Sequence, residues 1–125
     1  MASAPCTTTT WTYPFGRITA NAHLPNRRSD GAAPYDLRSA YDILIEPGDK
    51  DRVLTDLWVF VPEGYVGIIS ACSDWPLYRH LNVATTVVDQ TYKPNLGVII
   101  YNYTANALAI KKGARIAQLV FVKCI

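Results

Sequence analysis

The sequence predicts an all-β domain, folded as a sandwich or a barrel. Short apolar runs recur at close spacing between turn residues, and no stretch has a convincing amphipathic helical period, although residues 75–81 could form one helical turn. At 125 residues, half of them hydrophobic and 18% charged, the chain fits a single globular domain. We expect strands at residues 41–45, 52–61, 65–71, 83–88, 96–103, 107–110 and 115–122.

Turn residues separate these runs. Pro47-Gly48, Gly64 and Gly113 each stand between two apolar segments, where glycine and proline are typical of tight turns. Residues 1–30 are instead rich in Thr, Pro and Asn. We therefore divide the chain into an N-terminal extension at 1–30, either an edge strand or a mobile tail, and a β domain at 31–125.

The run at 52–61 is apolar on both faces. Leu57 and Val59 alternate with Trp58 and Phe60, so both sides of the expected strand need a cover. One cover is the core of the domain. The other is either a partner subunit, which favours an oligomer, or a second layer of the same chain.

Charge and cysteine content exclude several classes of function. The formal net charge is +2, too small for a broad nucleic-acid-binding field. No apolar run has the length of a membrane span or signal sequence. Cys6, Cys72 and Cys124 form no CxxC pair, so neither a disulfide framework nor a zinc site is indicated. An intracellular protein of the cytoplasm or nucleus is expected, without membrane or nucleic-acid partners.

Four segments resemble, in order, the conserved motifs of the trimeric dUTPases. They read APYDLRSAYD at 33–42, PEGYVG at 62–67 followed by CSD at 72–74, VVDQTYKP at 87–94, and KGARIAQL at 112–119. The resemblance covers residues 29–122. It implies a dUTPase-like β-clip, a distorted jelly-roll barrel, assembled as a homotrimer.

The resemblance also implies roles for individual residues. Asp89 stands where the family places the carboxylate that activates water for attack on the α-phosphorus of dUTP. Tyr92 would pack against the deoxyribose, and Asp36 would orient Mg²⁺ through water. Ser73 and Gln118 would donate hydrogen bonds to phosphate oxygens. No cofactor is expected, and Mg²⁺ only together with a bound nucleotide.

Three of these residues have a structural alternative. Asp89 could cap a turn at the end of a strand, as Asx residues often do. Tyr92 could pack on a neighbouring subunit. Asp36 could bond to turn amides or to Arg38 instead of serving a metal. These alternatives stay open on the sequence alone.

Three positions depart from the family pattern. Cys72 replaces an Arg, Asp74 replaces a Gly, and Pro94 replaces a Gly. The sequence given also ends before the family's Gly-rich fifth motif. Losing one charged donor at a transition state costs about 2.7–4 kcal/mol. We therefore expect a vestigial site that has lost catalysis.

Asp74 suggests one branch of the family. The adenovirus early-region-four open-reading-frame-one proteins, which are similar in length, also have an aspartate there. That resemblance implies a viral adaptor for host signalling or polarity proteins. The terminal residues 122–125 would be a weak PDZ ligand, because Lys123 stands where Ser or Thr is usual. The alternatives are an active dUTP pyrophosphatase with a modified site, and a nucleotide sensor.

Overall fold

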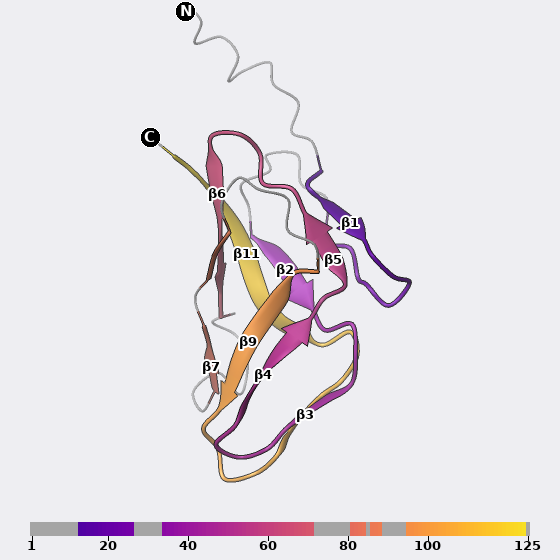
Figure 1. Ribbon diagram of the computed structural model, residues 1–125, viewed down its shortest axis with the longest axis vertical. Helices are drawn as coiled ribbons and strands as arrows, with labels where there is room; N and C mark the ends of the chain where they lie inside the picture. Colours follow the sequence, from indigo (N-terminus) through magenta and orange to yellow (C-terminus); the bar gives the residue numbers. More distant parts are fainter. Residues whose placement is uncertain (1–12, 27–33, 72–80, 85, 89–94, 125) are drawn as a thin grey trace, which may run out of the picture.

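The computed structural model describes residues 13–26, 34–71, 81–84, 86–88 and 95–124 (Figure 1). Within these residues the chain forms eleven strands, and the described part contains no helix. No helix in it is therefore long and apolar enough to cross a membrane. The all-β expectation is confirmed.

The largest sheet has four antiparallel strands. Its order is β2 (Tyr35–Arg38), β11 (Arg115–Lys123), β6 (Tyr65–Ser70) and β8 (Thr86–Val88). The long strand β11 lies in the middle and pairs with β2 on one side and β6 on the other. It crosses much of the length of the molecule in Figure 1.

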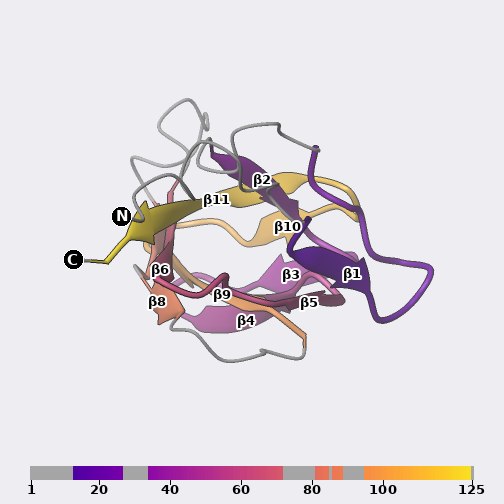
Figure 2. The ribbon, with the colours of Figure 1, turned by 90° about the horizontal axis from the view of Figure 1, so that it is seen from above.

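The remaining strands close the structure around the core. A three-stranded sheet has the order β4 (Lys50–Leu54), β9 (Gly97–Asn102) and β7 (Leu81–Val83). Two antiparallel pairs complete it, β3 (Ile43–Ile45) with β10 (Leu108–Ile110), and β1 (Phe15–Arg17) with β5 (Leu57–Val59). Seen end on in Figure 2, β2 and β11 lie on one side and β4, β5 and β9 on the other.

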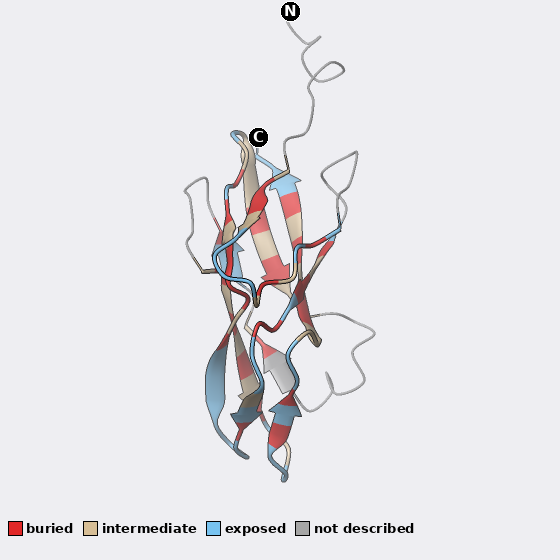
Figure 3. Ribbon diagram, turned by 90° about the vertical axis from the view of Figure 1, so that its right-hand side faces the viewer, coloured by how far each residue is buried: buried red, intermediate tan, exposed pale blue. Residues whose placement is uncertain are grey.

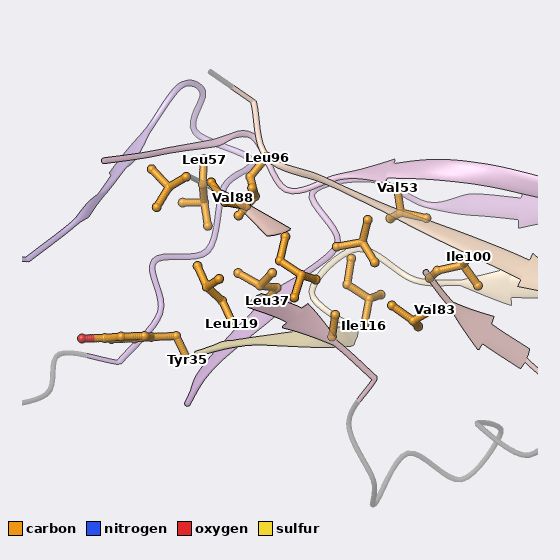
Figure 4. Packing of buried hydrophobic residues seen from close by; sticks show 14 of the residues in the cluster. Tyr35, Leu37, Val53, Leu57, Val83, Val88, Leu96, Ile100, Ile116 and Leu119 are labelled. Atoms are coloured by element: carbon orange, nitrogen blue, oxygen red, sulfur yellow. The ribbon is translucent and has the colours of Figure 1, made fainter. Parts of the chain in front are cut away.

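Alternating residues of the facing strands fill the interior. Leu37, Leu119, Val53, Ile100 and Ile116 are completely buried, and Figure 4 shows several of these side chains converging. Burying one aliphatic side chain of this size contributes about 1.5–3 kcal/mol. Buried and less buried positions alternate along the strands in Figure 3, as expected for strands with one face in a core.

Two predicted strands are each divided in the structure. The run at 52–61 forms β4 and β5, which belong to different sheets. The break falls at Asp56, whose φ of 54° is in the left-handed region. The run at 83–88 likewise includes the end of β7, paired with β9, and all of β8, paired with β6. In both cases the apolar pattern continues through a change of sheet, so alternation alone does not reveal it.

β1 provides part of the second cover for β5. A Cβ built on Gly16 would lie 2.1 Å from the Trp58 ring, so the indole lies directly against the glycine backbone. Only a residue without a side chain allows this approach. Phe60, just beyond β5, is 54% exposed. The cover for Trp58 therefore comes from the same chain.

The segment before residue 30 is described in part. Residues 13–26 carry β1 and pack Phe15 into the core, where its ring contacts Tyr35 at 5.1 Å between centroids. Residues 1–12, which include most of the expected edge strand, lie outside the described residues. The division of the chain at residue 30 stays a prediction.

Candidate active site

Three polar residues form one row across the four-stranded sheet. Asp36 of β2 is the register partner of Gln118 of β11, and Gln118 is the partner of Ser70 of β6. Directly opposed residues in antiparallel strands project from the same face. All three are half-buried. The first and fourth dUTPase-like segments thus meet side by side, 82 positions apart in sequence.

A bulge in β11 determines which face Gln118 occupies. The register against β2 shifts between Arg115 and Ala117, and both Ile116 and Ala117 are fully buried. Two consecutive inward residues break the strict alternation of a strand. Because of this irregularity, Gln118 lies on the outer face with Asp36, while Leu119 enters the core.

Asp36 has a cationic neighbour that the sequence did not indicate. Its Oδ2 lies 3.8 Å from Nη1 of Arg115, and the two side chains are 36% and 35% exposed. A half-exposed pair at this distance contributes little to stability. Arg38, the partner considered from the sequence, instead donates from Nη1 to the carbonyl of Gly113 at 2.9 Å.

The second and third segments continue from fixed points on this sheet. Residues 72–74 of the second segment follow Ser70 and Ala71 at the end of β6, and residues 89–94 of the third follow Val88 at the end of β8. Cys72, Ser73 and Asp74 lie outside the described residues, as do Asp89, Tyr92 and Pro94. The structure therefore tests none of these six site assignments.

Within one protomer, Val88 lies far from the polar row. Val88 pairs with Gly67, three residues along β6 from Ser70, and β8 is three strands away from β2. With about 3.4 Å per residue and about 4.8 Å between strands, Val88 lies about 17 Å from Asp36. β8 also runs away from the row of Ser70, because it is antiparallel to β6.

A hollow of about 230 Å³ lies beside the described residues that flank positions 89–94 of the third segment. Val88, the last described residue before those positions, and Asn95, the first after them, both line the hollow. Arg52 of β4 lines it as well, and its guanidinium donates to the carbonyl of Asn95 at 3.1 Å. The third segment thus starts and ends beside the same concave surface.

The outer face of the four-stranded sheet is apolar next to the polar row. Val120, Ile68 and Val87 are register partners two residues beyond Gln118 and Ser70, and Val122 pairs with Val66 two residues further. Val87 is 64% exposed and Val122 is 42% exposed. We call these five residues the valine face.

Among the described residues, Asp36 is the carboxylate in this row that is placed to bind a metal. Among the described residues, no group of three or more His, Cys, Asp or Glu side chains could hold a metal ion. A half-exposed carboxylate oxygen beside an amide fits a hard cation such as Mg²⁺, which keeps several of its waters and takes few protein ligands. Asp36 is therefore the described residue that would hold Mg²⁺, which would supply positive charge for a bound triphosphate.

The chain remains in the sheet up to its last described residue. Lys123 pairs with Tyr65, and the amide of Cys124 donates to the carbonyl of Gly64 at 2.6 Å. A PDZ ligand must offer its terminal backbone as an added strand. Residues 122–124 are bound along one edge to β6 and Gly64, which gives no support to the adaptor tail.

Comparison with protein families gives a match over most of the chain. The dUTPase family model matches residues 20–125. The chain is 37% identical over 107 residues to the deoxyuridine 5'-triphosphate nucleotidohydrolase of fowlpox virus, covering 86% of this chain and 74% of that protein. It is 40% identical to the mouse and 39% to the human mitochondrial enzyme, each over 106 residues and 85% of this chain. The chain spans 65% of the mouse protein and 42% of the human one.

Solved structures agree with this assignment. A mutant of the staphylococcal phage 80alpha dUTPase superposes with a TM-score of 0.78 at 31% identity, covering 89% of this chain and 83% of that one. A mutant dUTPase of the S. aureus phage phi11 gives 0.79 at 29% identity, with 89% and 90% covered. The description of the phi11 structure reports coordination of a structural Mg(II) ion.

These relatives correct the expectation that the chain is not an enzyme. Each of those named is a nucleotidohydrolase or a dUTPase. The inference of lost catalysis from Cys72 and Asp74 is therefore wrong. With a family model that matches residues 20–125 and relatives up to 40% identical, the chain belongs to the dUTPase family.

Proposed function

We propose that this protein hydrolyses dUTP to dUMP and diphosphate inside the cell. The observation that carries the proposal is the 37–40% identity to curated deoxyuridine 5'-triphosphate nucleotidohydrolases of fowlpox virus, mouse and human mitochondria. The chain keeps Asp89, Tyr92, Asp36 and Gln118 at the family's motif positions. The adjacency of Asp36 and Gln118 in one row supports a common site for the first and fourth motifs.

Each retained residue has a task in this reaction. Asp89 takes a proton from the water that attacks the α-phosphorus, and diphosphate leaves. Tyr92 packs on the deoxyribose, and Gln118 donates to a phosphate oxygen. Asp36 holds Mg²⁺ with the triphosphate, and the ion, when bound, neutralises phosphate charge.

The second motif makes this a slower enzyme than its relatives. Cys72 provides no charged donor, and removal of one such donor lowers the rate by about 10²–10³. Asp74 adds a negative charge near a polyanionic substrate, which opposes binding. Arg115, whose Nη1 lies 3.8 Å from Asp36, offsets part of this loss.

The active site is completed between protomers of a homotrimer. Within one protomer, Asp36 lies about 17 Å and Gln118 about 14 Å from Val88, too far for a base next to Val88 and a phosphate ligand to act on one substrate. The valine face next to the polar row exposes the apolar side chains of Val87 and Val122, as a surface covered by a partner subunit would. A neighbouring copy would bring its third motif to this row.

Hybrid assemblies test this arrangement. Asp36→Ala and Asp89→Asn chains are each expected to be nearly inactive alone. After joint refolding at equal amounts, about one quarter of the sites combine an intact Asp36 with an intact Asp89 from the neighbour, because each of the two is intact with probability one half. Diphosphate release should therefore recover to about one quarter of the unmodified level. Recovery would be absent if each protomer carried its own complete site.

A charge on the valine face is expected to prevent assembly. Val87→Asp places a carboxylate on a residue that is 64% exposed in the protomer, where a partner subunit would bury it. Leu44→Asp on β3, where Leu44 is 59% exposed, is the matched control. Light scattering should give a trimer for the control and a smaller species for Val87→Asp. A trimer in both variants would contradict the proposed interface.

A further inference from the structure

A buried carboxylate lies at the break between β4 and β5. Asp56 is 1% exposed, and both of its side-chain oxygens accept hydrogen bonds. Oδ2 accepts from Thr19 Oγ1 at 2.6 Å and from the hydroxyl of Tyr41, and Oδ1 accepts from Asn95 Nδ2 at 3.1 Å. Its backbone carbonyl also accepts from the amide of Ile18 at 2.8 Å. Three chain segments far apart in sequence therefore meet at one residue.

Asn95 binds Asp56 through two reciprocal hydrogen bonds. Its Nδ2 donates to the carboxylate, and its Oδ1 accepts from the Asp56 amide at 3.0 Å. Both residues have a left-handed backbone, with φ of 54° at Asp56 and 49° at Asn95. A non-glycine residue in this region persists where its surroundings hold it, and Asn and Asp tolerate it best. The pairing holds both backbones in this conformation.

Thr55 and Leu57, the two neighbours of Asp56, both bind Leu96, the residue after Asn95. The carbonyl of Leu96 accepts from the Thr55 amide at 3.0 Å and from Thr55 Oγ1 at 2.7 Å. The amide of Leu96 donates to the carbonyl of Leu57 at 2.8 Å. Arg52 also donates to the carbonyl of Asn95. The β4–β5 segment therefore holds four groups: the side-chain amide and the carbonyl of Asn95, and the amide and the carbonyl of Leu96. We call this set of contacts the 56–95 clamp.

The clamp is built around a charged group. Burial raises the pKa of Asp56, but the hydrogen bonds from Thr19, Tyr41 and Asn95 together lower it below its usual value. The carboxylate is therefore ionised at neutral pH. A buried charge of this kind requires its full set of donors, and removing one donor leaves an uncompensated charge.

We propose that Asp56 and Asn95 are positioning residues for the third motif, an inference that rests on the proposed function. Residues 89–94, with Asp89 and Tyr92, connect two fixed points. One is Val88, held in register by β6, and the other is Asn95, held by Asp56. Both points line the same hollow. A displacement of about 1 Å at a reacting group costs about 10²-fold in rate, so a change in how Asp56 holds Asn95 is expected to alter turnover through the segment that ends at Asn95.

An exchange of the two side chains tests this role. In Asn95→Asp, two carboxylates face each other, and we expect kcat to fall about 10²-fold and KM for dUTP to rise. In the double variant Asp56→Asn with Asn95→Asp, the amide donates to the carboxylate in the opposite direction. Residue 95 still accepts from the backbone amide, and residue 56 still accepts from Thr19 and Tyr41. The double variant should regain kcat to within about tenfold of the unmodified protein.

A second buried polar residue provides the matched control. Asn102 is fully buried and donates to the carbonyls of Ile45 and Asn106, each at 2.9 Å, at the end of β9 away from the third motif. Asn102→Asp should lower the melting temperature much as Asn95→Asp does, because in both a carboxylate oxygen faces acceptors that cannot donate to it. Assayed where both are fully folded, the control should keep the kcat and KM of the unmodified protein. A purely structural clamp would leave kcat per folded protomer unchanged in all three variants, which overturns the inference.

Hydrogen exchange separates this inference from the proposed function. If the unmodified protein does not turn over dUTP, the proposed function fails, whatever the clamp does. Asn95→Asp should nevertheless speed amide exchange in the peptide spanning residues 89–96, while Asn102→Asp speeds it near residues 102–107. If Asn95→Asp leaves exchange at 89–96 unchanged, or the exchanged pair fails to restore it, Asp56 and Asn95 do not position this segment.

Discussion

Replacing Asp89 with Asn is expected to lower kcat for dUTP by about 10²–10⁴, because the amide cannot take the proton of the attacking water. KM should change little, since the amide keeps the size of the carboxylate and the remaining substrate contacts are intact. Release of diphosphate from dUTP with Mg²⁺, followed against protein concentration, measures both constants.

Asp51→Asn is a suitable control for this variant. Asp51 is an exposed carboxylate of β4 whose Oδ1 accepts from the amide of Arg52. Asp51→Asn removes the same negative charge as Asp89→Asn, but Asp51 belongs to none of the motifs. Its kcat should therefore equal that of the unmodified protein. An Asp89→Asn protein as fast as this control would show that another group activates the water.

Restoring the family's residues in the second motif is expected to raise kcat by a factor comparable to the loss in Asp89→Asn. Cys72→Arg with Asp74→Gly adds a guanidinium donor for the phosphates and removes a carboxylate near them. We expect kcat to rise about 10²–10³-fold, with a lower KM for dUTP because a repulsive charge is lost. Steady-state kinetics at fixed ionic strength provide the measurement.

Cys72→Ser with Asp74→Gly separates the two contributions. Serine keeps the size of cysteine and adds no positive charge, so this variant should show the KM change without the gain in kcat. If the arginine variant is no faster than the serine variant, phosphate charge in this protein is neutralised elsewhere, and Arg115 is the first candidate because it lies 3.8 Å from Asp36.

Much of the fold follows from residue pattern, and the deviations have a physical cause. Gly48, Gly64 and Gly113 each have positive φ at expected turns, as a residue without Cβ permits. The break between β4 and β5 was not expected, because Thr55-Asp56 interrupts an apolar run by only two residues. The bend at Asp56 is held by its hydrogen-bond partner Asn95, 39 residues further along the chain.

The site was predicted less completely than the fold. The sequence motifs identified Asp36 and Gln118, and the structure brings them together in one row. Arg115 was not assigned beside Asp36, because the bulge between Arg115 and Ala117 sets that neighbourhood and leaves no mark in the residue pattern. Taken singly, the substitutions at Cys72 and Asp74 indicate lost catalysis, and the 37–40% identity to nucleotidohydrolases over most of the chain overturns that interpretation.

Analysis of the products formed from dUTP tests the proposed function most directly. Purified full-length protein, incubated with dUTP and Mg²⁺ and followed by phosphorus NMR, should convert the triphosphate to dUMP and diphosphate in one step, without dUDP. Chelation of the metal should slow the conversion, because Mg²⁺ neutralises phosphate charge in the reaction. Unchanged dUTP after prolonged incubation with near-stoichiometric trimer would contradict a dUTP-hydrolysing enzyme.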